Sequence, residues 1–154
     1  MNLIILSDTH DLLRPAVLEF LSGADLIFHA GDISSQAVVG RLATFAPLCV
    51  VRGNNDRGEW AEPIPHHLAL TLSGVRFFMV HNQKDVPENL TGTDVVIFGH
   101  SHKYCQEQRG QVLWLNPGSC GPHRPQQENT LMRAHISRGS ILVEKVLLPH
   151  EASG

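Results

Sequence analysis

The chain opens with Leu3-Ile4-Ile5-Leu6, an apolar run that leads directly into Ser7-Asp8-Thr9-His10. A short run of branched apolar residues bounded by polar ones is typical of a buried β-strand. Four later apolar runs end in the same way, on side chains that can bind a metal ion. These side chains are Asp32, Asn54, His81, His100 and His102. Five strands are therefore expected to deliver oxygen and imidazole ligands to one edge of a sheet.

The first half of the sequence alternates between strand and helix patterns. Residues 2–6, 26–30 and 48–52 are expected strands, and residues 14–21 and 34–43 are expected helices. Pro15 lies in the first turn of the first helix, and Ser34 or Ser35 caps the second. This order predicts a parallel sheet. Beyond Pro65 only strands are expected, at 67–72, 75–80, 94–98, 103–108, 111–115, 130–136 and 140–147.

Length, charge and cysteine content limit the class of protein. The 154 residues suit one domain spanning 1–154. A net charge of −3 provides no basic surface, so nucleic-acid binding is disfavoured. Three cysteines form no disulfide framework, and we find neither a signal peptide nor an apolar run that could span a membrane. We therefore expect a cytoplasmic protein.

The seven candidate ligands are sufficient for two metal ions that share one carboxylate. They are Asp8, His10, Asp32, Asn54, His81, His100 and His102. Two-metal sites hydrolyse phosphate esters, because they stabilise both the attacking and the leaving oxygen. Carboxylate, amide and imidazole donors suit Mn²⁺, Fe²⁺, Co²⁺, Ni²⁺ or Zn²⁺, and Mn²⁺ is the ion we favour. No cysteine lies in these motifs, which disfavours a structural zinc site.

The ordered motifs resemble those of the calcineurin-like metallophosphoesterases. The series comprises Asp8-x-His10, Gly31-Asp32, Gly53-Asn54-x-Asp56, His81 and Gly99-His100-x-His102. Together with the turn Asn116-Pro117-Gly118, it is similar to the small bacterial and archaeal phosphodiesterase branch, which also contains the eukaryotic retromer scaffold subunit. The resemblance implies an α/β fold, a four-layer α-β-β-α sandwich of two mixed sheets flanked by helices.

The resemblance also implies roles for the ligands. One metal ion would bind Asp8, His10 and His102, and the other would bind Asn54, His81 and His100. Asp32 would bridge the two ions, and a bridging water or hydroxide would attack the phosphorus in line. The expected catalytic residues are Asp32, Asn54, Asn55, Asp56 and His81. The expected activity is hydrolysis of phosphodiesters or small phosphorylated metabolites.

Two positions depart from the family pattern. Many members carry a histidine after the ligand asparagine, where it is thought to protonate the leaving group. This chain carries Asn55, which cannot deliver a proton at neutral pH. The loop after His81 reads Asn82-Gln83-Lys84-Asp85, where many members have Gly-His. Substrate preference therefore cannot be carried over from the family.

Other polar residues have both structural and functional explanations. Asp56 is expected to hold a loop or a ligand in place, and Asp11 is a possible N-cap of the first helix. Arg52 and Arg57 either bind phosphate or are solvated, and we favour Arg57 as a substrate contact. His29 is expected to be packed in the interior. The histidines expected outside the ligand set and exposed are His66, His67, His123, His135 and His150, of which His123 is the one we assign to substrate binding.

Two classes of function remain open. The first is a dinuclear metal-dependent phosphoesterase acting on a small phosphorylated substrate. The second is a protein-interaction scaffold on the same fold. Because a scaffold can lose metal ligands without penalty and this chain retains all seven, the enzyme is favoured. The sequence leaves the oligomeric state open, a homo-oligomer included.

Overall fold

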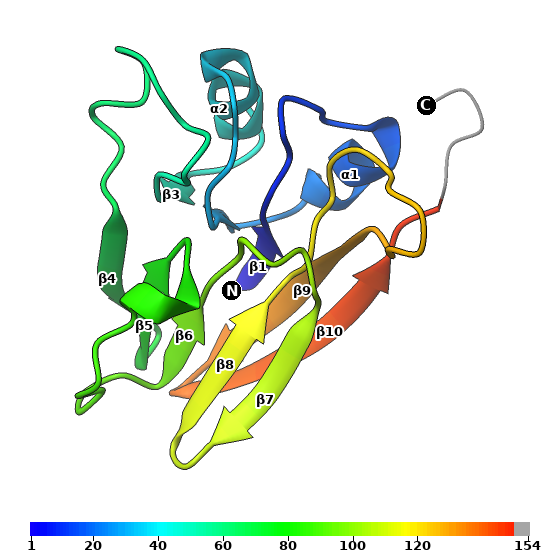
Figure 1. Ribbon diagram of the computed structural model, residues 1–154. Helices are drawn as coiled ribbons and strands as arrows, with labels where there is room; N and C mark the ends of the chain where they lie inside the picture. Colours follow the sequence, from blue (N-terminus) through cyan, green and yellow to red (C-terminus); the bar gives the residue numbers. More distant parts are fainter. Residues whose placement is uncertain (150–154) are drawn as a thin grey trace.

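The computed structural model describes residues 1–149, so residues 150–154, His150 among them, lie outside the described part. The described residues contain ten β-strands, which form two five-stranded sheets, and two α-helices, which pack on the outer face of the first sheet (Figure 1). All twelve elements occur where the sequence predicts them, with ends that differ by at most two residues.

The first sheet has the strand order β10-β9-β1-β2-β3. Strands β1 (Asn2–Leu6), β2 (Leu26–His29) and β3 (Leu48–Val50) pair in parallel, as predicted. Strands β9 (Thr130–Ser137) and β10 (Ser140–Leu147) form an antiparallel hairpin that joins β1. The connections between these parallel strands contain α1 (Pro15–Leu21) and α2 (Gln36–Ala43).

The second sheet has the strand order β4-β5-β6-β8-β7. Its central strands β5 (Val75–Val80), β6 (Val95–Ile97) and β8 (Val112–Asn116) are parallel. The outer strands β4 (His67–Leu72) and β7 (Cys105–Arg109) pair antiparallel with their neighbours. A short 3₁₀ helix, η1 (Gln83–Asp85), follows β5.

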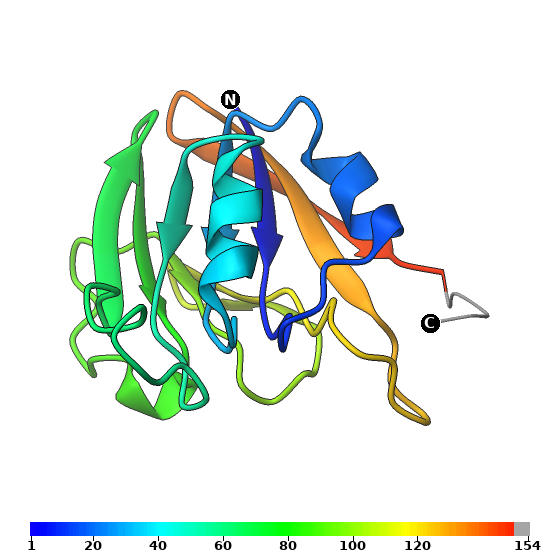
Figure 2. The same ribbon diagram turned by 90° about the horizontal axis from the view of Figure 1, so that it is seen from above.

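The sheets pack on one another through an apolar layer that includes Ile5, Phe28, Met79, Ile97 and Leu115. A second apolar layer joins the outer face of the first sheet to α1 (Pro15–Leu21) and α2 (Gln36–Ala43) (Figure 2). The two mixed sheets are thus confirmed. Within residues 1–149 both α-helices cover the first sheet, so the layers read α-β-β on the described part.

One edge of the molecule collects the ligand-bearing strand ends, but not from a single sheet as predicted. Strands β1, β2 and β3 belong to the first sheet, whereas β5 and β6 belong to the second. Strands β1, β2 and β3 run parallel to one another, as do β5 and β6, and each candidate ligand group combines residues that follow strands of both sheets. The prediction of one sheet was wrong because pairing between distant strands leaves no local signal.

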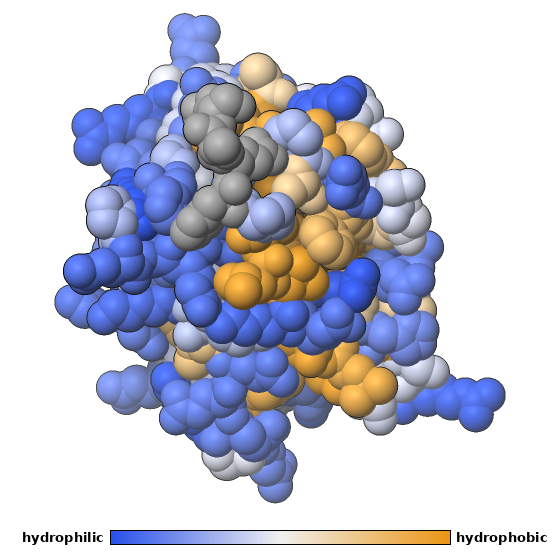
Figure 3. Space-filling model, turned by 90° about the vertical axis from the view of Figure 1, so that its right-hand side faces the viewer, coloured by the Kyte–Doolittle hydropathy of each residue, from blue (hydrophilic) through white to orange (hydrophobic). Residues whose placement is uncertain are grey.

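The face of the molecule in Figure 3 carries apolar surface among hydrophilic residues. Leu142 and Leu147 of β10 are 74% and 62% exposed, the highest values among the large apolar side chains of the described residues. No helix of the described residues is long and apolar enough to cross a membrane. All three cysteines are free.

Candidate metal centre

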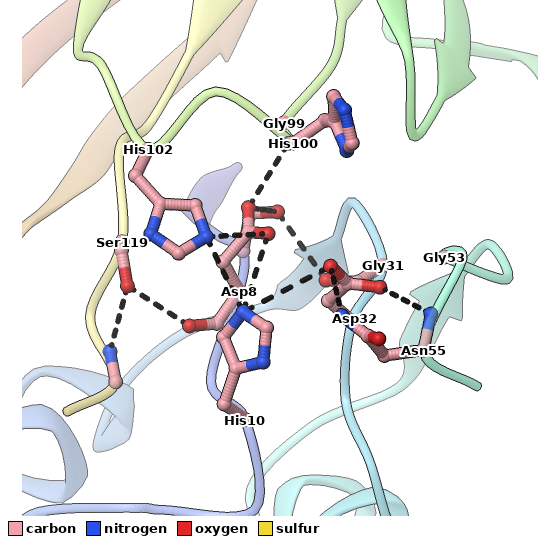
Figure 4. Close-up of polar contacts among 12 residues, drawn as sticks. Asp8, His10, Gly31, Asp32, Gly53, Asn55, Gly99, His100, His102 and Ser119 are labelled. Carbon is pink, nitrogen blue, oxygen red and sulfur yellow. Dashed lines mark hydrogen bonds and ion pairs between the residues drawn. The ribbon is translucent and has the colours of Figure 1, made fainter.

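Asp8, His10 and His102 form the first group of potential ligands (Figure 4). The Nε2 atom of His102 lies 3.3 Å from Asp8 Oδ1 and 3.3 Å from His10 Nε2. Asp8 Oδ1 is buried and has no hydrogen-bond partner. Because a buried carboxylate oxygen without a partner is costly, the arrangement fits a cation that this group would hold.

Asp32, His81 and His100 form the second group. Asn54 adds an amide oxygen, which lies 3.0 Å from His81 Nε2 and 3.2 Å from His100 Nδ1. The His81 Nδ1–H donates to the Ala30 carbonyl at 2.7 Å, which directs Nε2 toward the group. A histidine whose second nitrogen is fixed in this way is typical of metal sites.

The Asp32 carboxylate lies between the two groups. Its Oδ2 atom is 3.3 Å from His81 Nε2 of the second group and 3.8 Å from His10 Nε2 of the first. Asn55 donates to both oxygens, from its backbone N–H to Oδ1 at 2.9 Å and from its side-chain amide to Oδ2 at 3.1 Å. The sequence assigned no such contact to Asn55, because two adjacent asparagines carry no signal of which one turns toward Asp32.

Sharp turns after the strands bring the ligands together. Five of the seven have positive φ, with values of 56° at Asp8, 46° at His10, 58° at Asp32, 72° at His100 and 62° at His102. Non-glycine residues adopt this conformation rarely, and it concentrates at functional sites.

Two glycines permit the close approach of these turns, Gly53 next to Asp32 and Gly99 next to Asp8. A Cβ atom at Gly53 would overlap the backbone nitrogen and the carboxylate of Asp32, and one at Gly99 would overlap the side chains of Ser7 and Asp8. The glycines beside the ligand motifs are therefore required for packing around the centre.

Asp56 holds two of the turns in place, as the sequence predicted. Its carboxylate is buried and accepts backbone N–H bonds from Asp32, Ile33, Ser34 and Gly53 at 2.8–3.0 Å. It therefore joins the turn after β2 to the turn after β3.

Replacing Asp56 with Ala should destabilise the protein by roughly 2–4 kcal/mol, because several buried N–H groups lose their acceptor. Chemical denaturation of the metal-free protein measures the change. Asp25→Ala is the matched control, since the Asp25 carboxylate accepts one backbone bond at an exposed site, from Asn2 at 2.7 Å. Equal effects of the two substitutions would contradict the proposed role of Asp56.

The charges of the second group are coupled in the metal-free protein. Burial disfavours the ionised form of Asp32, yet hydrogen bonds from His81 and from the Asn55 backbone outweigh it and hold the pKa of Asp32 well below its usual range. Burial also opposes protonation of His81, but its bond to Asp32 and the charge of Asp8 raise the pKa of this imidazole. Since a metal binds neutral imidazole, protons and metal compete for His81.

His29 is a packed interior residue, as predicted. Burial lowers the pKa of His29 to about 3, against the opposing effect of Asp8. The neutral ring accepts from the Gly31 N–H at 3.1 Å through Nδ1 and contacts Thr9 Oγ1 at 3.0 Å through Nε2. His29 therefore supports the turns before Asp32 and after Asp8 and lies behind the ligands.

Two serines support Asp8, and neither was assigned a role from its position in the sequence. Ser7 donates to Asp8 Oδ2 at 2.6 Å. Ser119 donates to the Asp8 carbonyl at 2.9 Å, as Figure 4 shows. Ser119 follows the predicted Asn116-Pro117-Gly118 turn, in which Gly118 has a φ of 76°. The side chain of Asn116 donates to the Gly99 carbonyl at 3.2 Å. This turn thus packs against the His100 loop.

The remaining predicted residues lie around the centre at different distances from the ligands. Arg57 is exposed and makes no polar contact within residues 1–149, whereas Arg52 lines a cleft beside Asn54, His81 and His100. His123 is exposed and lines a different cleft, with Leu147 and Gln126. His66, His67 and His135 are exposed, as expected. Asp11 does not cap α1, whose N-cap is Arg14; it accepts a bond from Ser35 instead.

The chain is similar to proteins of known class. A phosphodiesterase of Methanocaldococcus jannaschii is 31% identical over 140 aligned positions, which cover 78% of this chain and 84% of that protein. The phosphodiesterase YfcE of Escherichia coli K12 is 32% identical over 147 positions, covering 77% and 79%. The crystal structure of a Vps29 mutant from Entamoeba histolytica shares the fold, with a TM-score of 0.75 at 21% identity over 97% of this chain and 100% of that one.

The family pattern extends over most of the chain. The family model of the calcineurin-like phosphoesterase superfamily domain matches residues 1–139, which include every ligand of both groups. The fold, the ordered motifs and the related phosphodiesterases agree with this match. The chain therefore belongs to the calcineurin-like phosphoesterase superfamily.

Proposed function

We propose that the protein is a dinuclear metal-dependent phosphodiesterase. The observation that carries the proposal is the position of Asp32 Oδ2, within 3.8 Å of an imidazole nitrogen from each ligand group. Asp8, His10 and His102 hold one ion, and Asn54, His81 and His100 hold the other. Asp32 serves both ions.

The donor set fits borderline divalent ions, and Mn²⁺ is the ion we favour, with Fe, Co, Ni and Zn as alternatives. When bound, such ions polarise the phosphoryl oxygens and lower the pKa of a water that serves as nucleophile. The neutral amide of Asn54 limits the negative charge around its ion. Asn55 holds the Asp32 carboxylate in a fixed orientation through its two hydrogen bonds.

The substrate we propose is a small phosphodiester or phosphorylated metabolite, since two related proteins are named phosphodiesterases. We also propose that residues 1–154 form a single domain and that the protein acts in the cytoplasm, where free cysteines are maintained. A protein-interaction scaffold is the second candidate, and the exposed leucines of β10 and the likeness to Vps29 favour it. The complete ligand set favours hydrolysis.

Metal content tests the proposal directly. Protein purified metal-free and then saturated with Mn²⁺ should retain two ions per chain after gel filtration, measured by elemental analysis. Hydrolysis of bis(4-nitrophenyl) phosphate should require the added metal. His102→Ala should reduce the stoichiometry, because the first group loses one of its three ligands. One ion per chain or none at saturating Mn²⁺ in the native protein would contradict a dinuclear centre.

A further inference from the structure

A cleft of about 360 Å³ adjoins the second ligand group. Its walls include the ligands Asn54 and His81, and beside them Arg52, His66, His67 and Asp85. A volume near the lower end of the usual range suits a small organic group and not a macromolecule. Because the cleft opens beside the ligands, one side of a substrate bound at the centre would extend into it.

The guanidinium of Arg52 is held in this cleft by hydrogen bonds to two backbone carbonyls of the loop before β4. Its Nη2 donates to the Glu62 carbonyl at 2.8 Å, and its Nε and Nη2 both donate to the Ile64 carbonyl, at 3.3 and 3.2 Å. Nη1 makes no hydrogen bond within residues 1–149. The guanidinium is thus oriented before any ligand binds, which lowers the entropy lost on binding.

The charge of Arg52 is not neutralised by the protein. Within residues 1–149 no carboxylate lies within ion-pair distance of this guanidinium. Asp85 of η1 also lines the cleft, and it forms no ion pair within the described residues. His66 and His67 add exposed imidazoles, and the His67 ring is stacked on Phe78 with centroids 5.6 Å apart. An oriented and unpaired guanidinium is a site for a phosphate or carboxylate.

A second cleft, beside His102, has a different character. Two lysines line it. The Lys145 ammonium forms an ion pair with Glu128 at 2.7 Å, and the Lys103 ammonium makes no polar contact within the described residues. A flexible lysine and a neutralised one select an anion less strongly than a fixed guanidinium. The two ester groups of a phosphodiester bound at the centre would therefore face clefts of different character, one lined by Arg52 and the other by Lys103 and Lys145.

We propose that the Arg52 cleft binds a second anionic group of the substrate, a phosphate or a carboxylate a few bonds away from the phosphorus that is hydrolysed. This inference rests on the proposed function, because it assigns the first phosphate to the metal centre. The Asp85 carboxylate, in the same cleft, disfavours an anion close to itself by repulsion, and it can accept a hydrogen bond from a hydroxyl of the same substrate arm.

The test compares ligands that differ in the second anion alone. Calorimetry on the Mn²⁺-loaded protein would measure binding of butylphosphonate, butane-1,4-diyl bisphosphonate and 5-phosphonopentanoate, with spacers one carbon shorter and longer. The two probes that carry an anion at each end distinguish a second phosphate-like group from a carboxylate. We expect at least one of them to bind about tenfold more tightly than butylphosphonate, the gain of one charge-assisted hydrogen bond in an open cleft.

Three variants test whether Arg52 is the residue that recognises the second anion. Arg52→Gln should remove the preference for the second anion, and Asp85→Asn should increase it about two- to threefold by removing a repulsion. Arg138→Gln, which removes an arginine from the β9–β10 turn, is the charge-matched control and should leave the preference unchanged.

Two results would overturn the proposal in distinguishable ways. If butylphosphonate binds and no second anion improves the affinity, or if Arg52→Gln leaves the preference intact, the cleft does not bind an anion and the metal centre stands. If no probe binds the loaded protein, the proposed function fails, and the assignment of the cleft fails with it.

Discussion

Asp32→Asn is expected to lower hydrolysis of bis(4-nitrophenyl) phosphate by at least about a hundredfold, the order observed when a main electrostatic element is removed. The native carboxylate is buried, carries a depressed pKa and lies between both ligand groups. An amide at this position removes a negative charge that each ion needs. We therefore expect fewer than two Mn²⁺ ions per chain at metal concentrations that saturate the native protein.

Asp94→Asn is the matched control, because it makes the same chemical change in an exposed ion pair with Arg76 at 2.9 Å. Its metal content and rate should equal those of the native protein. His29→Gln should also retain two ions, since His29 lies behind the ligands, whatever its effect on stability. An active Asp32→Asn variant together with loss of metal in His29→Gln would show that the ligand assignment is wrong.

The ligand positions could be predicted from sequence because each one follows a strand, and strands are marked by local apolar runs. A residue at the end of a buried strand has little freedom of direction, so five ordered motifs predict convergence. The division of the strands between two sheets could not be predicted. It depends on which strands become neighbours in a sheet, as β1 and β9 do, and these two strands are separated by more than a hundred residues.

The surroundings of the ligands were predicted less well, for a related physical reason. Asp56 could be assigned a supporting role because it lies two residues from Asn54 in the same motif. Which of Arg52 and Arg57 faces the cleft depends on the path of the loop that contains Glu62 and Ile64. The carbonyls of this loop accept hydrogen bonds from Arg52 and hold its side chain in the cleft. Ser119 reaches Asp8 across 111 positions of the chain, and no spacing rule reports such a contact.

The second large effect is expected at Asn55, for substrates with poor leaving groups. The side-chain amide donates to Asp32 Oδ2 at 3.1 Å and has no proton to release at neutral pH. The leaving oxygen must therefore depart as an anion or take a proton from water. Rates across a series of aryl phosphodiesters should fall steeply as the pKa of the leaving group rises, measured at saturating Mn²⁺.

Asn55→His should flatten this dependence. A positioned acid typically contributes about 10²–10⁴-fold, and mainly when the leaving group is poor. We expect a gain of about tenfold or more for alkyl esters from an imperfectly placed imidazole and almost none for 4-nitrophenyl esters. Asn55→Gln is the control, since it keeps an amide and adds no acid; it should leave the slope steep even if it lowers all rates.

A flat dependence in the native protein, with the chemical step limiting the rate, would show that another acid already acts. His123 is exposed and lines a cleft with Leu147 that contains no metal ligand. His66 lines the cleft that also contains His81 and Asn54. An imidazole acts as a general acid only within hydrogen-bond reach of the leaving oxygen, directly or through one water. His66→Gln would then be expected to steepen the dependence, and His123→Gln to leave it flat.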